Sequence, residues 1–244
     1  MAYKLALQLY SIREDFEQDY IGTLKKVSEL GFEGVEFAGF YNIEAKILKE
    51  ILQEYGLEVA GSHTSYDLLL NHLDEVISYN KKIGNKHIIC PWCEFSTREK
   101  LEDIIINFNW ISQRLLEQGM YLSYHNHSQE FEKIEDTYIL DYIFENCPSI
   151  LPELDVYWIY QGGENEIEYV KKYKEKMKLL HLKDGTRSKG TALFEGEVDL
   201  MGVLKEVESS NITWLVIEDE TKYPMSMDSV SRSINNFKSR IKKI

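Results

Sequence analysis

The feature that most constrains the fold is a pattern that occurs four times in the first half of the chain. In each case an amphipathic run leads to a glycine, at Gly31, Gly56, Gly84 or Gly119, and a short apolar run follows. Hydrophobic residues recur with the period of a helix up to the glycine, which can adopt the left-handed conformation that ends a helix. Each segment therefore predicts a helix joined to a strand by a short loop.

Eight β-rich runs can be counted along the whole chain. They are Leu5–Leu9, Gly34–Phe37, Glu58–His63, His87–Cys90, Tyr121–His127, Glu153–Tyr157, Lys178–Lys183 and Leu215–Asp219. Helical patterns separate them at intervals of mostly about thirty residues, as a βα repeat requires. Eight such units predict an α/β fold, a single closed (βα)8 TIM barrel, which typically takes about 250 residues. The alternative is an open doubly wound sheet, but neither GxGxxG nor GxxxxGK[ST] follows any early strand.

Length and composition favour one domain in a reducing compartment. No linker, low-complexity tract or composition break divides the chain, so we expect residues 1–244 to form one barrel. The N-terminal apolar run is too short for a signal peptide, and no stretch approaches the roughly 18 apolar residues of a transmembrane helix. We therefore expect a cytoplasmic protein with no membrane partner. The sequence leaves homo-oligomerisation open.

Charge and cysteine content exclude two further classes of function. The net charge of −13 argues against a nucleic-acid partner, because phosphate binding rests on clustered Lys and Arg. Cys90 and Cys93 have the CxxC spacing of a redox or zinc motif. A thioredoxin-type motif would open a helix, and a zinc site would need a matching second pair of Cys or His. Neither context is present, so we interpret this CPWC segment as structural.

Polar residues gather at the predicted C-terminal ends of the strands, where a barrel carries its active site. They are Glu36, His63, His125, His127, Asp155, His181, Lys183, Asp184 and Glu218. Charged residues are almost never buried alone, but groups from several strands around a divalent cation can offset the cost of burial together. His72 and His87 lie outside this pattern, and we interpret both as structural.

Period-two alternation allows one residue from each of four strands to point at a common centre. We predict a metal site formed by His125, Asp155, His181 and Glu218. Mixed nitrogen and oxygen ligands suit Mn²⁺ or Zn²⁺, and also Co²⁺ or Fe²⁺, better than Ca²⁺ or Mg²⁺. Each residue also has a structural alternative: a histidine can be a hydrogen-bonded core residue, Asp155 can cap a loop, and Glu218 can pair with a lysine.

Five segments occur in order along the second half of the chain, namely YHNHSQEF, ELDVYWIYQGG, LLHLKDG, EGEVDL and LVIEDE. They resemble the sugar phosphate isomerase/epimerase family with the xylose isomerase-like TIM barrel, and LALQLYSIRED and GFEGVEFAGF resemble its first two strands. The resemblance implies a metal held by Glu, Asp, His and Glu. The last three fall on Asp155, His181 and Glu218, but the first falls on His125. Because the family's epimerases are thought to use the two glutamates as acid and base, this change departs from a two-glutamate mechanism.

These observations predict a divalent-metal-dependent isomerase or epimerase that removes a proton next to the carbonyl of a keto-sugar or cyclitol. Glu218 and His127 are the candidate bases, with His127 one pleat further out than His125 and not a metal ligand. Lys183 is a candidate for stabilising an oxyanion. We expect Trp158 and Phe37 to stack on a sugar ring, and Glu36, His63 and Asp184 to bind its hydroxyls.

Three alternative functions follow from the same residues. Loss of a β-leaving group would give a dehydratase or lyase acting on an inosose or a 3-keto-sugar, and the histidine at position 125 favours this branch. A non-catalytic sugar-binding barrel would keep aromatic residues but would not need the four ligands. A DNA-repair endonuclease of the same superfamily would need a histidine where this chain has Trp158.

Overall fold

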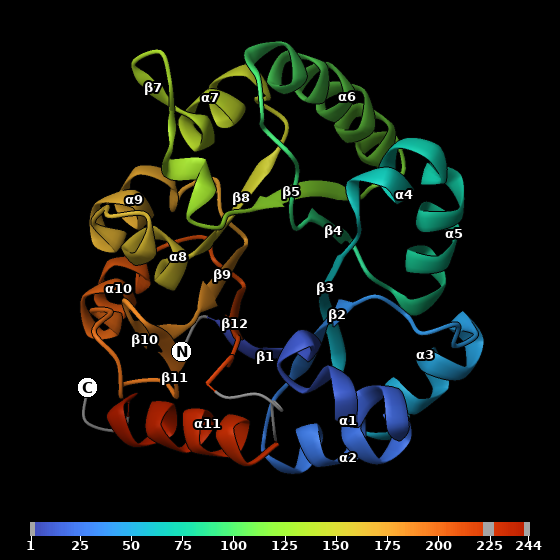
Figure 1. Cartoon of the computed structure of the whole chain (residues 1–244). Coiled ribbons are helices and arrows are strands. Elements are labelled where there is room, and N and C mark those ends of the chain that lie inside the picture. Colours follow the sequence, from blue (N-terminus) through green and yellow to red (C-terminus); the bar gives the residue numbers. More distant parts are fainter. Residues whose placement is uncertain (1–2, 222–226, 242–244) are drawn as a thin grey trace.

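The computed structural model describes residues 3–221 and 227–241. In this part of the chain, parallel strands close into a barrel in the order β1-β12-β9-β8-β5-β4-β3-β2, and helices surround it (Figure 1). The barrel strands are β1 (Lys4–Gln8), β2 (Gly34–Ala38), β3 (Glu58–His63), β4 (His87–Cys90), β5 (Tyr121–His125), β8 (Leu151–Asp155), β9 (Leu179–Leu182) and β12 (Trp214–Ile217). The predicted (βα)8 TIM barrel is confirmed.

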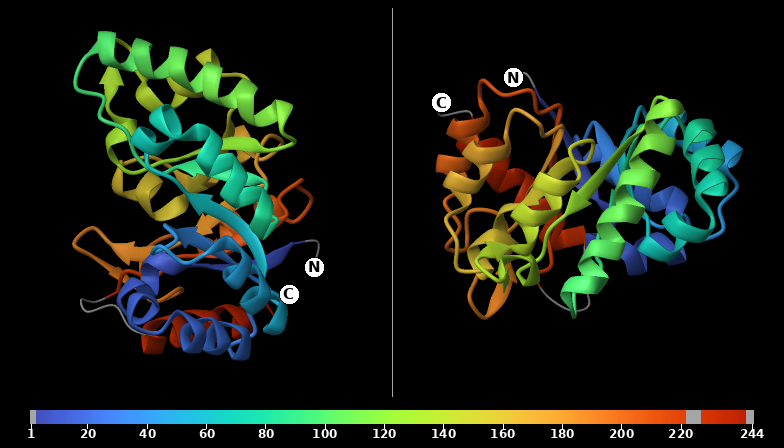
Figure 2. Two further views of the ribbon diagram at one scale, coloured as in Figure 1. Left: turned by 90° about the vertical axis from the view of Figure 1, so that its right-hand side faces the viewer. Right: turned by 90° about the horizontal axis from the view of Figure 1, so that it is seen from above.

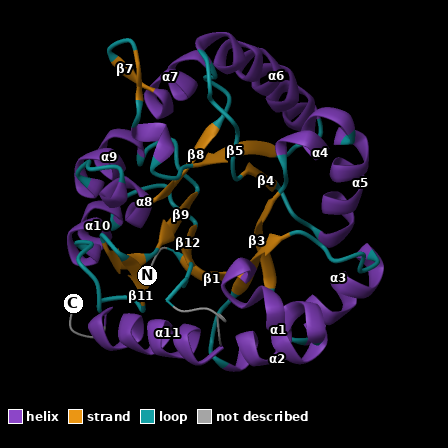
Figure 3. Ribbon diagram, viewed as in Figure 1, coloured by secondary structure: helices purple, strands orange, loops and turns teal. Residues whose placement is uncertain are grey.

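The longer helices form the outer ring, which Figures 2 and 3 show from the side and along the barrel. They are α2 (Tyr20–Glu29), α3 (Ala45–Glu54), α5 (Leu73–Ile83), α6 (Arg98–Glu117), α7 (Ile139–Asn146), α9 (Glu166–Tyr173), α10 (Leu200–Val207) and α11 (Met227–Ile241). Gly31, Gly56, Gly84 and Gly119 all have positive φ. The four helix-glycine-strand segments are therefore built as predicted. Among the described residues, no helix is both long and apolar enough to cross a membrane.

Shorter elements follow several strand ends and shape the loops around the barrel mouth. They are the 3-10 turns η1 (Leu9–Ile12) and η2 (Gln129–Phe131), the helices α1 (Arg13–Gln18), α4 (Tyr66–Asn71) and α8 (Val156–Gln161), and the small strands β6 (Lys133–Ile134), β7 (Thr137–Tyr138), β10 (Asp184–Thr186) and β11 (Lys189–Thr191). The two pairs of small strands are antiparallel hairpins. Because α8 begins at Val156, strand β8 ends at Asp155, two residues earlier than predicted.

The barrel interior changes from apolar to polar along the strands. A small buried cluster of Ala6, Ala60, Leu179, Trp214 and Val216 fills the end at which the strands begin. A side chain at Gly34 would clash there, since its Cβ would lie 2.7 Å from Cη2 of Trp214. Two residues further along, alternation places polar side chains inside the barrel. The outward-facing side chains of the strands join the helices in one large hydrophobic core.

Candidate metal centre

Four side chains from neighbouring strands meet inside the polar end of the barrel. His125 and Asp155 end β5 and β8, His181 lies in β9, and Glu218 follows β12 directly. One ligand atom from each lies within 4.8 Å of the others. His125 Nε2 is 3.6 Å from Asp155 Oδ2, and His181 Nδ1 is 3.0 Å from Glu218 Oε2. The structure thus brings together the predicted ligand set.

The unpartnered atoms of this cluster fit a divalent cation. Both ring nitrogens of His125 and Oδ2 of Asp155 are buried without a hydrogen-bond partner among the described residues, and such groups are costly to leave unpaired. Burial, together with His181 and His63, holds the pKa of His125 well below its usual value. His125 is therefore neutral, as a metal ligand must be.

Asp155 and Glu218 each serve two purposes at once. Asp155 Oδ1 accepts hydrogen bonds from the backbone N–H groups of Tyr157 and Trp158 at the start of α8, which leaves Oδ2 for the centre. Glu218 Oε1 accepts a hydrogen bond from Lys183 Nζ at 3.0 Å, which leaves Oε2 for the centre. Each carboxylate therefore makes the structural contact named as its alternative role, a helix cap for Asp155 and a lysine pair for Glu218, and still directs its second oxygen to the centre.

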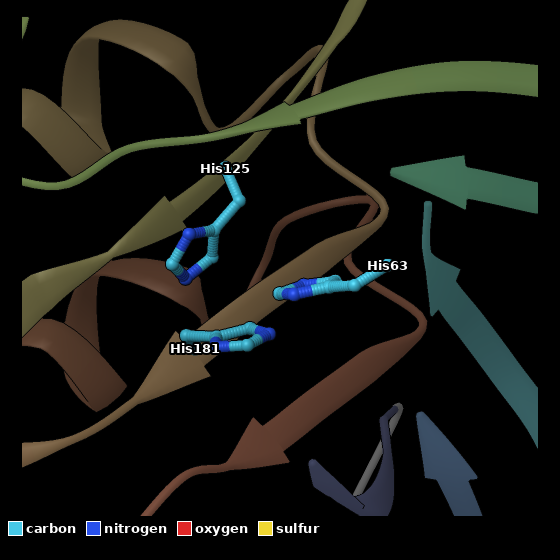
Figure 4. Close-up of side chains that lie close together, drawn as sticks. All are labelled: His63, His125 and His181. Carbon is cyan, nitrogen blue, oxygen red and sulfur yellow. The ribbon is translucent and has the colours of Figure 1, made fainter. Parts of the chain in front are cut away.

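A second layer of charged groups lies on the Nε2 side of the His181 ring, opposite the candidate metal centre. Glu36 Oε1 is 2.8 Å from His181 Nε2 and 3.0 Å from His63 Nε2, and Gln8 Nε2 donates to the same oxygen at 2.7 Å. Glu153 Oε2 is 3.1 Å from His63 Nε2. His181 therefore directs Nε2 towards Glu36 in the second layer and Nδ1 towards Glu218 at the candidate metal centre. Figure 4 shows the rings of His63, His125 and His181 converging from their three strands.

These contacts shift the pKa values of His63 and Glu153 in the second layer. Burial lowers the pKa of His63, but the carboxylates of Glu36 and Glu153 outweigh it and raise the pKa to about 9. Burial and the charge of Glu36 raise the pKa of Glu153 to about 7. Glu36, His63, Glu153 and His181 could also hold a metal ion. In that group, however, Nε2 of both His63 and His181 has a carboxylate within hydrogen-bond distance, whereas neither ring nitrogen of His125 has a hydrogen-bond partner among the described residues.

Lys183 and His127 lie beside the centre, in contact with Glu218 and His125 respectively. Lys183 Nζ also pairs with Glu220 and is 4.7 Å from the ring centroid of Trp158. Burial lowers its pKa, but Glu218, Asp155 and Glu220 outweigh burial and raise it above the usual value, so Lys183 stays charged. The His127 ring is 5.0 Å from His125 and 5.2 Å from Trp158. Burial lowers the pKa of His127 to about 3, so its imidazole is neutral.

Of the five residues predicted to bind substrate, only His63 lines the cavity above the centre, and Trp158, Phe37, Glu36 and Asp184 do not. Phe37 packs on Phe16 and Phe40 outside the barrel, because its neighbour Glu36 points inward and side chains alternate along a strand. Glu36 is fully buried beneath His181. Asp184 accepts hydrogen bonds from backbone N–H groups of the loop that follows it. The stacking prediction for Phe37 is wrong, and Glu36 and Asp184 instead hold other groups in place.

A cavity of about 820 Å³ opens above the centre, with His63, His125, His127 and Glu218 at its inner end. Three residues near it escaped the sequence analysis. Glu153 could have been found, because it shares a strand face with Asp155. Glu220 lies beyond a strand end. Glu130 is buried and accepts hydrogen bonds from the Tyr124 hydroxyl and the His127 N–H, which fixes the loop that carries His127.

Comparisons with known proteins agree with the resemblance drawn from the five segments. The sequence model of the xylose isomerase-like TIM barrel family matches residues 24–239. An inosose dehydratase of Clostridium botulinum is 24% identical, over 84% of this chain and 83% of its own. A sugar phosphate isomerase/epimerase from Parabacteroides distasonis superposes with a TM-score of 0.83 at 22% identity, covering 98% of this chain and 94% of its own. A probable 3-DHS dehydratase from Bacillus anthracis superposes with a TM-score of 0.77 at 14% identity, covering 98% of this chain and 99% of its own.

Proposed function

Because the chain belongs to the xylose isomerase-like TIM barrel family, we propose that it is an enzyme that uses a divalent cation to remove a proton next to the carbonyl of a keto-sugar or cyclitol. The unpartnered nitrogens of His125 and the unpartnered Oδ2 of Asp155 carry this proposal. His181 and Glu218 complete a four-ligand set with them, and His125 and Glu218 line the inner end of the cavity. A bound Mn²⁺ or Zn²⁺ ion, or Co²⁺ or Fe²⁺, would supply Lewis acidity at the substrate's carbonyl oxygen.

The residues above the centre supply the groups that bind substrate and carry protons. His127 lines the cavity 5.0 Å from the ring of His125, and its imidazole is the group that would accept the α-proton. Lys183 holds Glu218 in place and keeps a positive charge beside the site. Glu220 lines the same cavity, and burial raises its pKa although Lys183 opposes the rise. Glu220 is therefore a second proton carrier, on the Lys183 side of the site.

Dehydration is the reaction that this arrangement supports best. His127 takes the proton from the α-carbon, the bond from the β-carbon to its hydroxyl breaks, and Glu220 protonates the departing hydroxyl to give water. The family's strand-five glutamate is replaced by His125, so a pair of metal-bound glutamates is not available to work on both faces of a substrate. The relatives named inosose dehydratase support the same choice.

Isomerisation or epimerisation is the second candidate. His127 and Glu218 line one cavity and are chemically different, so one could remove a proton and the other return it. A non-catalytic sugar-binding barrel is less well supported, because a binding protein has no need of buried carboxylates and imidazoles that are expensive to desolvate.

Solvent deuterium incorporation tests the proposal whatever the net reaction. The protein would be loaded with Mn²⁺ and incubated in D₂O with a panel of inososes and 3-keto-sugars, and the products would be followed by NMR. We expect deuterium next to the carbonyl, or loss of water, with at least one substrate. His181→Ala, which removes a central ligand, is the control and should show neither. Absence of both reactions across the panel with fully metal-loaded protein would contradict the proposal.

A further inference from the structure

The cavity above the centre is larger than one sugar ring requires. Its volume of about 820 Å³ lies in the range of roughly 300–1,000 Å³ found for sites that enclose drug-sized ligands. The inner end contains His125, His127 and Glu218, and the outer end runs across the segments that follow β1, β2, β3 and β4. A single ring at the centre would leave this outer end to a different part of the ligand.

Aromatic side chains dominate the outer end. They are Tyr10, Phe40, Tyr41, Tyr79 and Trp92, which we call the aromatic rim. Three of the five are substantially exposed, with Trp92 at 51%, Tyr10 at 41% and Tyr41 at 38%. Large exposed apolar groups that gather in one hollow mark binding sites more often than rings scattered singly over a surface. Aromatic faces of this kind pack well against other rings.

The CPWC segment holds one side of the aromatic rim in place. Cys90 and Cys93 are buried, and their sulfur atoms lie 3.6 Å apart. Gln129 Nε2 donates to the Cys93 carbonyl at 3.0 Å, and Pro91 restricts the backbone between them. The turn is therefore anchored on both sides of Trp92, whose own ring remains exposed. This gives the cysteine motif a positioning role.

The opposite side of the aromatic rim is equally constrained. Tyr41 and Asn42 have φ values of 48° and 58°, which are uncommon for residues with a side chain. Such strained backbone tends to cluster at functional sites. Phe40 stacks on Tyr79 with ring centroids 4.1 Å apart, and the Tyr79 hydroxyl donates to the Ile43 carbonyl at 2.7 Å. The rings are thus held before any ligand arrives, which lowers the entropic cost of binding.

The charges of the described residues that line the cavity do not favour an anionic ligand group. Among the described residues that line it, the charged side chains other than histidine are the carboxylates Glu75, Glu218 and Glu220, with no Lys or Arg. Phosphate and carboxylate groups are recognised by Arg, Lys or helix N-termini. This lining favours an uncharged group for the part of the ligand that reaches the aromatic rim.

We propose that the aromatic rim is a subsite for a second, uncharged ring of the substrate, so that the substrate is a keto-glycoside and not a free keto-sugar or cyclitol. The shared chemistry is a ring with an apolar face, which either an aryl aglycone or a second sugar supplies. This inference rests on the proposed function for the ring at the metal centre, but the subsite can be tested by binding alone.

The test compares ligand binding by calorimetry in Mn²⁺-loaded protein. Glucose, phenyl β-glucoside, a glucose disaccharide and glucose 6-phosphate serve as unreactive probes. We expect the phenyl glucoside, the disaccharide or both to bind about tenfold tighter than glucose, as one well-formed aromatic contact allows. Trp92→Ala should remove most of this preference. Trp110→Ala is the matched control, because Trp110 is 47% exposed on α6 and does not line the cavity.

Four results would overturn the inference. Glucose could bind as tightly as the two-ring probes, or the preference could survive Trp92→Ala. Glucose 6-phosphate could bind tightest, which would refute the charge argument. Finally, Trp92→Ala could convert a dimer into a monomer with no change in the preference, which would make the aromatic rim a contact between chains. Loss of deuterium exchange with an intact binding preference would refute the proposed reaction and leave the subsite standing.

Discussion

Replacing Glu36 by glutamine should weaken metal binding although Glu36 is not a predicted ligand. Glu36 Oε1 lies 2.8 Å from His181 Nε2, and this contact orients the ring so that Nδ1 faces Glu218 and Asp155. A carboxylate in this position fixes the tautomer of a metal-binding histidine and raises its basicity. Glutamine has nearly the same shape but carries no charge, so Glu36→Gln tests the carboxylate without opening a cavity.

The expected size of the effect follows from these contacts. Losing the carboxylate partner of a metal-binding histidine typically weakens metal affinity about 10–100-fold, which corresponds to about 1.4–2.8 kcal/mol. Glu36 is also a main cause of the raised pKa of His63. The surroundings leave little room for adjustment, since a Cβ at Gly61 would lie 2.9 Å from Glu36 Oε2. The glutamine should therefore stay in place and show the electrostatic loss.

A competition titration of Mn²⁺ against a fluorescent chelator measures the change directly. Glu75→Gln is the matched control, because Glu75 lines the same cavity but its side chain is 81% exposed and lies 3.3 Å from His72 on the surface. Glu36→Gln should bind Mn²⁺ 10–100-fold more weakly than wild type, and Glu75→Gln should match wild type. Equal affinities for wild type and Glu36→Gln would refute the claim that Glu36 sets the orientation of His181.

Three further predictions concern single side chains. His127→Asn should keep its metal and lose about 10²-fold or more in kcat, the usual contribution of a general base; wild-type turnover at full metal content would remove His127 from the mechanism. Lys183→Gln should lower the free energy of unfolding by about 3–5 kcal/mol in urea titrations, because Glu218 and Glu220 lose their buried partner; a change below 1 kcal/mol would mean that solvent already screens the pair. Burial lowers the pKa of His87 to about 4, below its unfolded value of about 6.5, so the unfolded chain binds the extra proton and stability is lost as pH falls from 6.5 towards 4. Thermal melts of His87→Gln should show a smaller loss over that range than wild type, and parallel curves would refute this.

Much of the barrel and its centre could be predicted because both depend on regular periodicities. Helix-ending glycines located the early strands, and the polar residues at strand ends located Asp155, His181 and Glu218. Alternation within a strand also explains the error at Phe37. Side chains next to each other on a strand cannot both face the axis, so placing Glu36 inside sends Phe37 outside.

The loops could not be predicted in the same way, because their conformations depend on single contacts and not on a repeating pattern. Trp92 is exposed on a turn that the buried side chains of Cys90 and Cys93 anchor from both ends. Tyr41 reaches the cavity through a backbone of positive φ that no sequence period indicates. The strand-end pattern predicts Asp184 at the mouth of the barrel, but its carboxylate accepts hydrogen bonds from the backbone N–H groups of the following loop. The aromatic rim therefore became visible only in three dimensions.

One divalent cation should bind to His125, Asp155, His181 and Glu218 and not to the neighbouring layer of Glu36, His63 and Glu153. Anomalous diffraction from crystals grown with Mn²⁺ tests it most directly, because the position of the peak identifies the ligands. We predict one peak per chain, bonded to His125, Asp155, His181 and Glu218, and none in crystals of His181→Ala. A peak among Glu36, His63 and Glu153 would contradict the account, as would full occupancy in the variant.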